Sequence, residues 1–589
     1  MARYTGMRLA LTLSTLSFHR CRPHAPLMLR LLLLCVLSFQ LASCAYAPPE
    51  SRSAQAAVAS AHPLATQAGI DILQQGGNAF DAAVAVSAAL AVVEPYSSGI
   101  GGGGFWLLHI EKDGRDVMLD GRERAPLAAH RDMYLDANAE VIPGASINGP
   151  LSAGIPGEPA ALAHLAENYG KLALSQSLQA AIRYAREGFA VDAHYQRMAQ
   201  FRLDAINQYP STAAILLKQG EVPAIGDLIV QTDLAGTLEH IAKQGAEGFY
   251  AGEVANKLVE SVRRHGGIWQ LQDLAEYRVI EREPLVTHYR DMKVTSVAPP
   301  SSGGVAIAQI LNMLEALDYQ DLDQTRRNHA LIEAMRRAYR DRAEFLGDTD
   351  YVDVPLQRLM SKQHAAQLLL DFDAQRATPS STLKPVAKDT GKATDTTHFS
   401  IIDQHGNRVS ATLSINYPFG ACFIAEGTGV LLNDEMDDFS AQPGTPNAYG
   451  LVGGSANAIA PGKRMLSSMS PSFIETDDRL AVLGTPGGSR IITMVLRAML
   501  DFYEGADADH MVNLPRLHHQ YLPDSVSYEA GALEETVVRD LTAMQHLLEK
   551  HESGFGNMQV VIRHKASGML EAASDARGLG EARVTMHPR

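Results

Sequence analysis

The order of apolar and polar residues along the body of the chain predicts alternating helices and strands. Residues 57–75 are predicted to form a helix that stops at the glycine pair 76–77. Residues 80–90 are apolar on nearly every side, which is typical of a helix buried in the interior. That helix is expected to end at residues 94–95, Glu-Pro, and a glycine run then leads into a strand at 105–110.

The same pattern continues through the rest of the chain and predicts a mixed α/β protein. Helices are expected at 158–203 and 231–264, and strands followed by helices at 294–297 with 306–317 and at 480–483 with 491–502.

Residues 376–395 interrupt this pattern, because they are rich in Ser, Thr, Pro and Lys, a composition typical of a mobile linker. Two short strands follow directly, at 398–403 and 408–415, and the turn at 405–407 between them predicts a hairpin. Thr396 therefore stands where a flexible segment meets the first strand of a hairpin.

Composition limits the class of protein. The chain has 589 residues, of which 46% are hydrophobic and 20% charged, as in ordinary globular proteins with a sizeable core. The formal net charge of −15 disfavours a surface that follows nucleic-acid phosphates, so no nucleic-acid partner is expected.

The first 43 residues are expected to be a leader. From Met28, which could be the true start, a positive residue, an apolar segment and small residues follow one another as in a secretory signal. The four residues 41–44, Leu-Ala-Ser-Cys, resemble the lipobox of bacterial lipoproteins, with Cys44 as the lipidated residue. The alternative is a plain signal cleaved near Ala45 or Ala47. Either signal predicts export across the inner membrane to the periplasm, with membrane attachment through Cys44 in the first case.

Cysteine usage agrees with this division of the chain. Cys21, Cys35 and Cys44 all lie in the leader, so Cys422 is alone in the body and an intramolecular disulfide cannot form there. We expect Cys422 to be a small buried hydrophobic residue.

Thr396 has a possible chemistry of its own. A threonine before a strand is commonplace and can be purely structural. Cleavage between Asp395 and Thr396, however, would free an α-amine beside the threonine hydroxyl. The pKa of an α-amine, roughly 7.7–8.0, suits a base at neutral pH. Such a threonine could act as a nucleophile without a separate histidine.

Eight motifs occur along the body of the chain. They are Gly-Gly-Asn-Ala-Phe-Asp-Ala-Ala-Val-Ala at 76–85, Gly-Gly-Gly-Gly-Phe at 101–105, Asp-Gly-Arg-Glu-Arg-Ala-Pro at 120–126, Pro-Pro-Ser-Ser-Gly-Gly at 299–304, Thr-Thr-His-Phe-Ser at 396–400, Leu-Asn-Asp-Glu-Met-Asp-Asp-Phe-Ser at 432–440, Ser-Ser-Met-Ser-Pro at 467–471 and Gly-Thr-Pro-Gly-Gly-Ser-Arg at 484–490. Each motif alone is modest, but their order and spacing are specific. Together they resemble the γ-glutamyltransferase family of N-terminal-nucleophile hydrolases, from about residue 50 to 585.

The resemblance implies a catalytic group built around Thr396 as the nucleophile of both self-cleavage and catalysis. Its other members are Thr397, which orients the new amine, Asn416, which contacts the amine and the substrate, Ser414, and Gly487 and Gly488, whose N–H groups face the tetrahedral intermediate. Ser414 departs from the family, which commonly has a threonine there. The glycine pair also stands before a predicted helix, whose N-terminus favours an anion.

The resemblance also implies a substrate-binding group. Its members are Arg122, Ser467 and Ser468 for the substrate α-carboxylate, Glu435 and Asp438 for the α-ammonium group, and Tyr449 as the gate of a lid loop at 446–454. A guanidinium pairs with a carboxylate through two hydrogen bonds, which fits the role of Arg122. Family members have either Gln or Glu at the position of Glu435.

Rival motifs fail in their context. The glycines at 99, 101 and 104 have dinucleotide-binding spacing, but a helix precedes them and a strand follows, the reverse of the required order. The pair His518-His519 lacks a second ligand pair with zinc spacing, so we interpret both as structural. No metal and no organic cofactor are expected.

The resemblance implies a four-layer α-β-β-α sandwich. A large chain of residues 44–395 and a small catalytic chain of 396–589 would stay together as a heterodimer. The expected substrates are glutathione and related γ-glutamyl amides, with water, amino acids or dipeptides as acceptors.

Two alternatives remain open. One is a β-lactam acylase of the same fold for glutaryl-like groups, against which Glu435 and Asp438 argue. The other is an uncleaved periplasmic binding protein, against which Thr396, Asn416 and the glycine pair argue.

Overall fold

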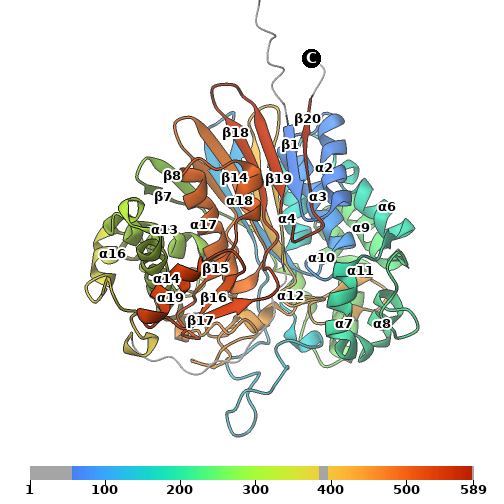
Figure 1. Cartoon of the computed structure of the whole chain (residues 1–589). Coiled ribbons are helices and arrows are strands. Elements are labelled where there is room, and N and C mark those ends of the chain that lie inside the picture. The colour runs from blue at the N-terminus through green and yellow to red at the C-terminus, as the bar shows by residue number, and fades with distance from the viewer. Residues whose placement is uncertain (1–55, 384–395, 443, 587–589) are drawn as a thin grey trace, which may run out of the picture. The chain divides into compact units, whose positions relative to one another are not determined.

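Two antiparallel β-sheets form the centre of the protein in a computed structural model that describes residues 56–383, 396–442 and 444–586 (Figure 1). The first sheet has the order β20-β1-β9-β10-β2-β3-β6. Its strands are β1 (Ala56–Ser60), β2 (Gly103–Ile110), β3 (Arg115–Gly121), β6 (Ile280–Arg282), β9 (Thr397–Ile402), β10 (Arg408–Ser414) and β20 (Glu581–Thr585). The second sheet has the order β19-β18-β14-β13-β8-β7. Its strands are β7 (Leu285–Tyr289), β8 (Met292–Ser296), β13 (Ser472–Glu475), β14 (Arg479–Gly484), β18 (Gln559–His564) and β19 (Leu570–Ser574).

The sheets pack against each other, and helices cover their outer faces. An apolar cluster joins the sheets through Ala57, Ala59, Leu107, Ile402, Phe473, Leu480, Val482, Val561 and Leu570. Helices α2 (Pro63–Gln74), α3 (Ala79–Val93) and α4 (Glu158–Asn168) contact the first sheet, and α13 (Gly303–Ala316) and α17 (Ile491–Tyr503) contact the second. The expected four-layer α-β-β-α sandwich is confirmed (Figure 1).

Helix α3 shows how the sequence builds one of these layers. Asn78 accepts hydrogen bonds from the first turn and Asp81 accepts one from the Asn78 N–H, which forms a capping box. All fifteen residues of α3 are buried, as the apolar pattern predicts, because alanine side chains let the helix lie close to the sheet. The helix stops before Pro95, and Glu94 is thereby fixed at its end.

The predicted helix at 57–75 was wrong at its start. Residues 56–60 form β1, which pairs with β9 on one side and β20 on the other, and the helix begins only at Pro63. The run Ala-Ala-Val-Ala-Ser is compatible with either a helix or a strand, so pairing with the neighbouring strands determines its structure.

The predicted linker is anchored at its beginning. The Thr378 N–H donates to Glu333, the Ser380 N–H to Asp524, and the Ser380 hydroxyl to the Tyr521 carbonyl. Ser380 is fully buried, in a short turn at Ser380–Thr382. Residues 384–395, which include Asp395, lie outside the described residues, as do Cys44 and the rest of the leader.

Strands from both sides of Thr396 contribute to each sheet. In the first sheet β1, β2, β3 and β6 precede Thr396, while β9, β10 and β20 follow it. In the second sheet β7 and β8 precede it and the other four strands follow it. The hairpin predicted behind Thr396 is confirmed as β9 and β10.

The remaining elements extend the helical layers or form small sheets. The other helices are α5 (Leu174–Ser177), α6 (Gln179–Glu187), α7 (Ala193–Asn207), α8 (Pro210–Leu216), α9 (Thr232–Gln244), α10 (Glu247–Tyr250), α11 (Gly252–Arg264), α12 (Leu271–Ala275), α14 (Gln324–Phe345), α15 (Leu356–Leu359), α16 (Lys362–Leu368), α18 (Ala508–Asn513) and α19 (Glu535–Ala543). The small sheets pair β4 (Phe189–Ala190) with β5 (Leu228–Ile229), β11 (Ile424–Ala425) with β12 (Val430–Leu431), and β15 (Leu517–His518) with β16 (Val526–Glu529) and β17 (Leu548–His551).

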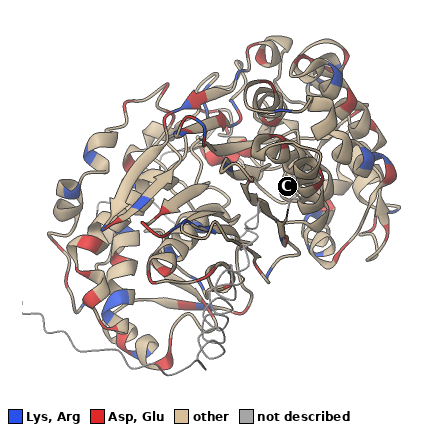
Figure 2. Ribbon diagram, turned by 90° about the horizontal axis from the view of Figure 1, so that it is seen from above, with Lys and Arg blue, Asp and Glu red and all other residues tan. Residues whose placement is uncertain are grey.

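Charged residues of both signs are distributed over the helices and loops, whereas the strands are mainly uncharged (Figure 2). Within the described ranges, every helix is too short or too polar to cross a membrane. Cys422 is buried as expected, and burial raises the pKa of its thiol to about 11.

Candidate active site

Thr396 lies directly before β9 and is almost completely buried, with 5% of its surface exposed. The next residue, Thr397, pairs with Leu413 of β10, so the end of β10 lies beside the start of β9. The Thr397 hydroxyl donates a 2.7 Å hydrogen bond to the carboxylate of Glu94 at the end of α3. Burial is the main cause that raises the pKa of Glu94 to about 7, because it disfavours the charged form.

The chain turns sharply after β10 and brings Asn416 into the site. Asn416 has a φ of +74°, a left-handed conformation that asparagine tolerates better than most residues. Its backbone N–H donates to the Ser414 hydroxyl at 2.8 Å, and its side-chain amide donates to the Asp434 carbonyl at 3.0 Å. Ser414 thus supports the turn that holds Asn416.

Arg122 lies at the centre of a buried ionic cluster. Its guanidinium is 2.6 Å from the Glu435 carboxylate, pairs with Asp438, and is 3.4 Å from Glu123. The residues predicted to bind a carboxylate and an ammonium group therefore neutralise each other here. A ligand that carries both charges could replace this internal pairing without leaving a charge unpaired.

The carboxyl groups around Arg122 are close enough to affect one another. Burial raises the pKa of Glu435 to about 7, and the Arg122 charge opposes this shift. Burial and the charge of Glu435 raise the pKa of Glu123 well above its ordinary value. One oxygen of Glu435 and one of Glu123 lack a hydrogen-bond partner among the residues described. The cluster can therefore accept a further donor, such as an ammonium group.

Ser467 and Ser468 are held by the loop that precedes α13. The Ser467 N–H donates to the Pro300 carbonyl at 2.8 Å, and the Ser467 carbonyl accepts from the Ser302 hydroxyl at 2.7 Å. Arg342 of α14 donates to the Ser468 hydroxyl at 3.2 Å. The motif Pro-Pro-Ser-Ser-Gly-Gly thus positions the serine pair.

Gly487 and Gly488 form the turn between β14 and α17, as predicted. Their φ angles of +138° and +55° lie in the region that favours glycine. A Cβ atom on Gly488 would lie 2.6 Å from the ring of Tyr449. The pair therefore combines a helix N-terminus with a close approach of the loop that carries Tyr449.

Tyr449 covers the site. Its hydroxyl donates to the Asn416 carbonyl at 2.7 Å, and the side chain is buried. Asp437 supports this loop by accepting from the Ala448 N–H at 2.9 Å and from Ser146 at 2.7 Å. These contacts give Asp437 a structural role in holding the loop.

A small cavity of 20 Å³ brings the predicted residues together. Its lining includes all of them except Thr397, which lies behind Thr396, and Gly487. The predicted residues in the lining are Arg122, Thr396, Ser414, Asn416, Glu435, Asp438, Tyr449, Ser467, Ser468 and Gly488.

A second cavity of 480 Å³ also reaches Thr396. Gly487 and Glu94 contribute to its lining, and so do Arg490 and Phe555. Thr396 and the glycine turn therefore border two cavities, one small and ionic and the other large.

One group of possible metal ligands occurs in the described part of the chain, formed by His329, Glu333 and His546. The two rings contact each other through nitrogens 2.7 Å apart, and the Glu333 carboxylate pairs with Arg336 and Arg337. These contacts occupy the Glu333 carboxylate and the facing nitrogens of the two rings, whereas Nδ1 of His546 has no hydrogen-bond partner among the residues described. The group lines neither cavity at Thr396. His518 and His519 are buried and bonded to Gln520 and Asp524, which agrees with a structural role.

Sequence reasoning missed Glu94, Glu123, Arg342 and Arg490. Glu123 and Arg490 lie inside the motifs at 120–126 and 484–490, and this position in the sequence could have indicated that they lie near the site. Glu94 and Arg342 contact the site from helices far away in sequence and carried no such signal.

The two sheets between helical layers, with a buried threonine at the start of a central strand, define an N-terminal-nucleophile hydrolase fold. A family model described as gamma-glutamyltranspeptidase matches residues 65–585. The chain belongs to this family.

Relatives agree with this assignment. The chain is 45% identical over 485 residues to a glutathione hydrolase proenzyme of Pseudomonas sp. (strain A14), covering 81% of this chain and 83% of that protein. It is 40% identical over 535 residues to the glutathione hydrolase proenzyme of Escherichia coli K12, covering 90% and 92%. The crystal structure of cephalosporin acylase from Bacillus halodurans superimposes with a TM-score of 0.79 at 27% identity, covering 90% and 96%.

Proposed function

We propose that the protein cuts its own chain before Thr396 and then transfers γ-glutamyl groups, with Thr396 as the nucleophile of both reactions. The observation that carries this proposal is the position of the buried Thr396. It lies between a glycine turn and a small cavity whose lining has charges of both signs, as a ligand with an ammonium and a carboxylate group requires. Relatives named glutathione hydrolase proenzyme support both the activity and the processing.

Self-cleavage starts with attack of the Thr396 hydroxyl on the carbonyl carbon of Asp395. The peptide C–N bond breaks as the nitrogen takes a proton, and an ester joins Asp395 to the Thr396 oxygen. Water then hydrolyses the ester, which leaves a carboxylate on Asp395 and frees both the hydroxyl and the α-amine of Thr396. The hydrogen bond between Thr397 and Glu94 orients the adjacent hydroxyl toward this new amine.

Acyl transfer uses the same hydroxyl. The α-amine of Thr396 takes the hydroxyl proton while the oxygen attacks the γ-carbonyl carbon of the substrate. The N–H groups of Gly487 and Gly488 stabilise the tetrahedral oxyanion, which typically lowers the barrier by about 3 kcal/mol per donor. The leaving amine takes the proton and departs, and a γ-glutamyl ester of Thr396 remains. Water, an amino acid or a dipeptide then attacks this ester and releases Thr396.

The ionic cavity selects the γ-glutamyl group. Arg122, Ser467 and Ser468 bind its α-carboxylate. Glu435 and Asp438 bind its α-ammonium group. Tyr449 closes the cavity, and opening requires its bond to the Asn416 carbonyl to break. No metal or organic cofactor enters this mechanism.

Glutathione and related γ-glutamyl amides are the proposed donors. The two pieces, residues 44–395 and 396–589, remain together as a heterodimer, because both sheets take strands from each. The leader directs export to the periplasm, and Cys44 provides a lipid anchor.

Two other functions fit less well. A glutaryl-type β-lactam acylase binds a group without an α-ammonium, which would leave Glu435 and Asp438 without a ligand partner. An uncleaved binding protein would have no use for the glycine turn beside Thr396.

The first test is the mass of the denatured protein beside that of Thr396→Ala. We expect two fragments from the wild type, the smaller one beginning at Thr396, and a single chain from the variant. Hydrolysis of γ-glutamyl-4-nitroanilide, compared with its glutaryl analogue, then tests the substrate class. An uncut wild type would support the binding protein, and preference for the glutaryl compound would support the acylase.

A further inference from the structure

Within the part of the chain that the structure describes, one arginine in the lining of the larger cavity at Thr396 has no carboxylate beside it to balance its charge. The cavity is lined by Arg490, together with Arg197 and Arg577. Glu94 is the acidic residue of the lining, and it is bonded to Thr397. Which of the three arginines is available to a ligand depends on its own contacts.

Arg577 and Arg197 are poor candidates. Arg577 forms ion pairs with Glu529 at 2.6 Å and Asp575 at 3.0 Å, so its charge is balanced. Arg197 is exposed and donates to the ring of His194 at 2.8 Å. An exposed charge is solvated and screened, and it contributes little to selective binding.

Arg490 differs from both. Throughout the described ranges, no carboxylate lies within 4.0 Å of its guanidinium. The group is half-buried and lies over the ring of Phe555, 4.6 Å from its centroid. Burial lowers the pKa of Arg490, and Glu529, already paired with Arg577, acts on it only through its charge. A partly desolvated guanidinium without an anion is unfavourable, and a bound anion would relieve it.

The position of Arg490 in the helix adds to this imbalance. Arg490 is the N-cap of α17, where the helix dipole disfavours a positive side chain. It follows Gly487 and Gly488 in one short turn, Gly488–Arg490. The guanidinium and the N–H groups of this turn thus combine to favour negative charge beside Thr396.

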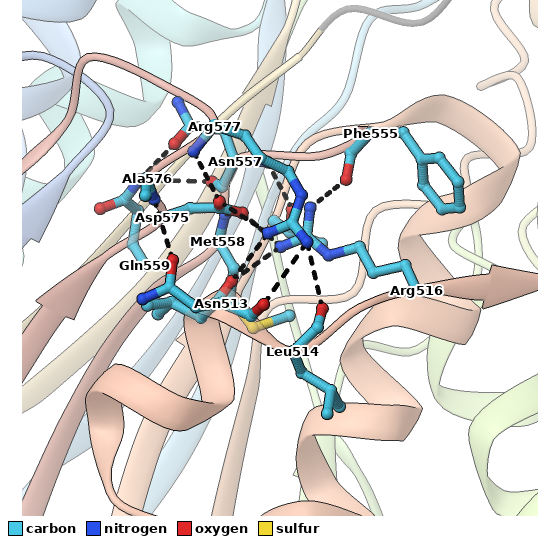
Figure 3. A network of polar contacts seen from close by, with 12 residues as sticks. Asn513, Leu514, Arg516, Phe555, Asn557, Met558, Gln559, Asp575, Ala576 and Arg577 are labelled. Atoms are coloured by element: carbon cyan, nitrogen blue, oxygen red, sulfur yellow. Dashed lines mark hydrogen bonds and ion pairs between the residues drawn. The ribbon is translucent and has the colours of Figure 1, made fainter. Parts of the chain in front are cut away.

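The loop that carries Phe555 is held by several side-chain contacts. Figure 3 shows Arg516 between the Phe555 carbonyl and the Asp575 carboxylate, with Arg577 bonded to the other oxygen of Asp575. These contacts hold the backbone at Phe555, whose ring lies under the Arg490 guanidinium. Packing against a held residue reduces the entropy that a side chain loses when it binds a ligand.

We propose that Arg490 binds a carboxylate in the larger cavity, namely the carboxylate of the leaving group before acyl transfer or of the acceptor after it. This proposal rests on the proposed function, because it takes Thr396 to be the nucleophile that receives the γ-glutamyl group. It places that group and the amine in separate cavities. The γ-glutamyl group occupies the small cavity, and an anionic amine such as an amino acid or dipeptide occupies the large one. Arg490 thereby selects amines with a free carboxylate over neutral amines.

The test compares γ-glutamyl-4-nitroanilide with γ-glutamyl-3-carboxy-4-nitroanilide, which differ by one carboxylate on the leaving group. We expect wild-type kcat/KM to be about tenfold to a hundredfold higher for the carboxylated compound, the range of a charge-assisted hydrogen bond. In Arg490→Met this ratio should fall close to one. Arg490→Lys should retain part of it, because a point charge remains without the planar fork.

Arg539→Met is the matched control, because Arg539 is exposed on α19 and lines neither cavity. Its ratio should equal that of the wild type. The acceptor arm compares glycylglycine with glycylglycine amide. In wild type the amide should need a concentration about tenfold higher for half-maximal transfer, and Arg490→Met should remove this difference.

The outcomes separate the two proposals. A wild type that cleaves the neutral anilide without preferring the carboxylated one overturns the role of Arg490 and leaves the proposed function intact. A wild type that cleaves neither anilide overturns both. If Arg490→Met fails to self-cleave, the wild type and Arg490→Lys still test the proposal. Carboxylate binding is contradicted if Arg490→Lys keeps the full wild-type preference for the carboxylated anilide and the wild type uses glycylglycine and its amide equally well.

Discussion

The Thr397 hydroxyl donates a 2.7 Å hydrogen bond to the buried carboxylate of Glu94, from a helix more than 300 residues earlier in the chain. The donated proton leaves the lone pairs of the hydroxyl free to accept from the α-amine that cleavage would create at Thr396. The negative charge of Glu94, which lies next to the Thr397 hydroxyl, favours the protonated form of that amine.

Replacement of Glu94 by Gln should therefore change the pH dependence of catalysis. The α-amine acts as a base only when neutral, and loss of the nearby charge should lower its pKa by about one unit. The acid limb of kcat/KM for γ-glutamyl-4-nitroanilide should shift to lower pH by that amount. An unchanged acid limb in a fully cleaved Glu94→Gln enzyme would show that Glu94 is structural only.

The same substitution should change stability in the uncut chain. Burial raises the pKa of Glu94 to about 7, above the ordinary value of 4.5, so the folded state binds the proton more tightly. The stabilisation from that proton is complete below pH 4.5 and is lost as the pH rises through 7. In the Thr396→Ala background, the Tm of the Glu94→Gln variant minus that of its parent should increase between pH 5 and 8. A difference independent of pH would contradict the raised pKa.

Replacement of Asp438 by Asn should relax the choice of substrate. The variant keeps the shape of the site but removes one charge opposite Arg122. The preference for γ-glutamyl-4-nitroanilide over its glutaryl analogue should fall about tenfold to a hundredfold, mainly through KM. Asp437→Asn is the control, because Asp437 contacts Ser146 and the lid loop instead of Arg122. Equal ratios in both variants would remove Asp438 from substrate binding.

Replacement of Gly488 by Ala should impair catalysis. A Cβ would meet the Tyr449 ring at 2.6 Å, and the positive φ of +55° disfavours alanine, so the turn must shift its N–H groups. We expect kcat to fall about a hundredfold or more. Gly252→Ala has a similar φ of +65° but open space around the Cβ position, so it should lower stability by about 1 kcal/mol and leave kcat unchanged. Similar kcat values for the two variants would exclude the glycine turn from the reaction.

Local sequence signals were sufficient where one element decides its own structure. Helix α3 has its capping residues and apolar run within twenty positions, and the hairpin behind Thr396 has its turn between its strands. The glycine turn before α17 was equally local. Resemblance to a family supplied the candidate ligand-binding residues, which periodicity alone does not distinguish from other polar residues.

Structure was needed where distant segments meet. Residues 56–60 become a strand because β9 and β20 flank them, and their own sequence does not specify this. The mutual neutralisation of Arg122 with Glu435 and Asp438 joins positions over 300 residues apart. The absence of a carboxylate beside Arg490 in the described part of the chain can be seen only in the structure, because the sequence does not show which acidic residues lie near it.

The position of β1 between β9 and β20 affects how the enzyme can be made. The proposed cut before Thr396 would put β1 on one fragment and both of its neighbours on the other. Separately synthesised fragments would have to insert β1 between β9 and β20 in a bimolecular step. The uncut chain avoids this step, because all three strands assemble while the local concentration of each is fixed by covalent linkage. The strand order therefore favours synthesis as one polypeptide followed by the proposed cut, which would also free the α-amine of Thr396.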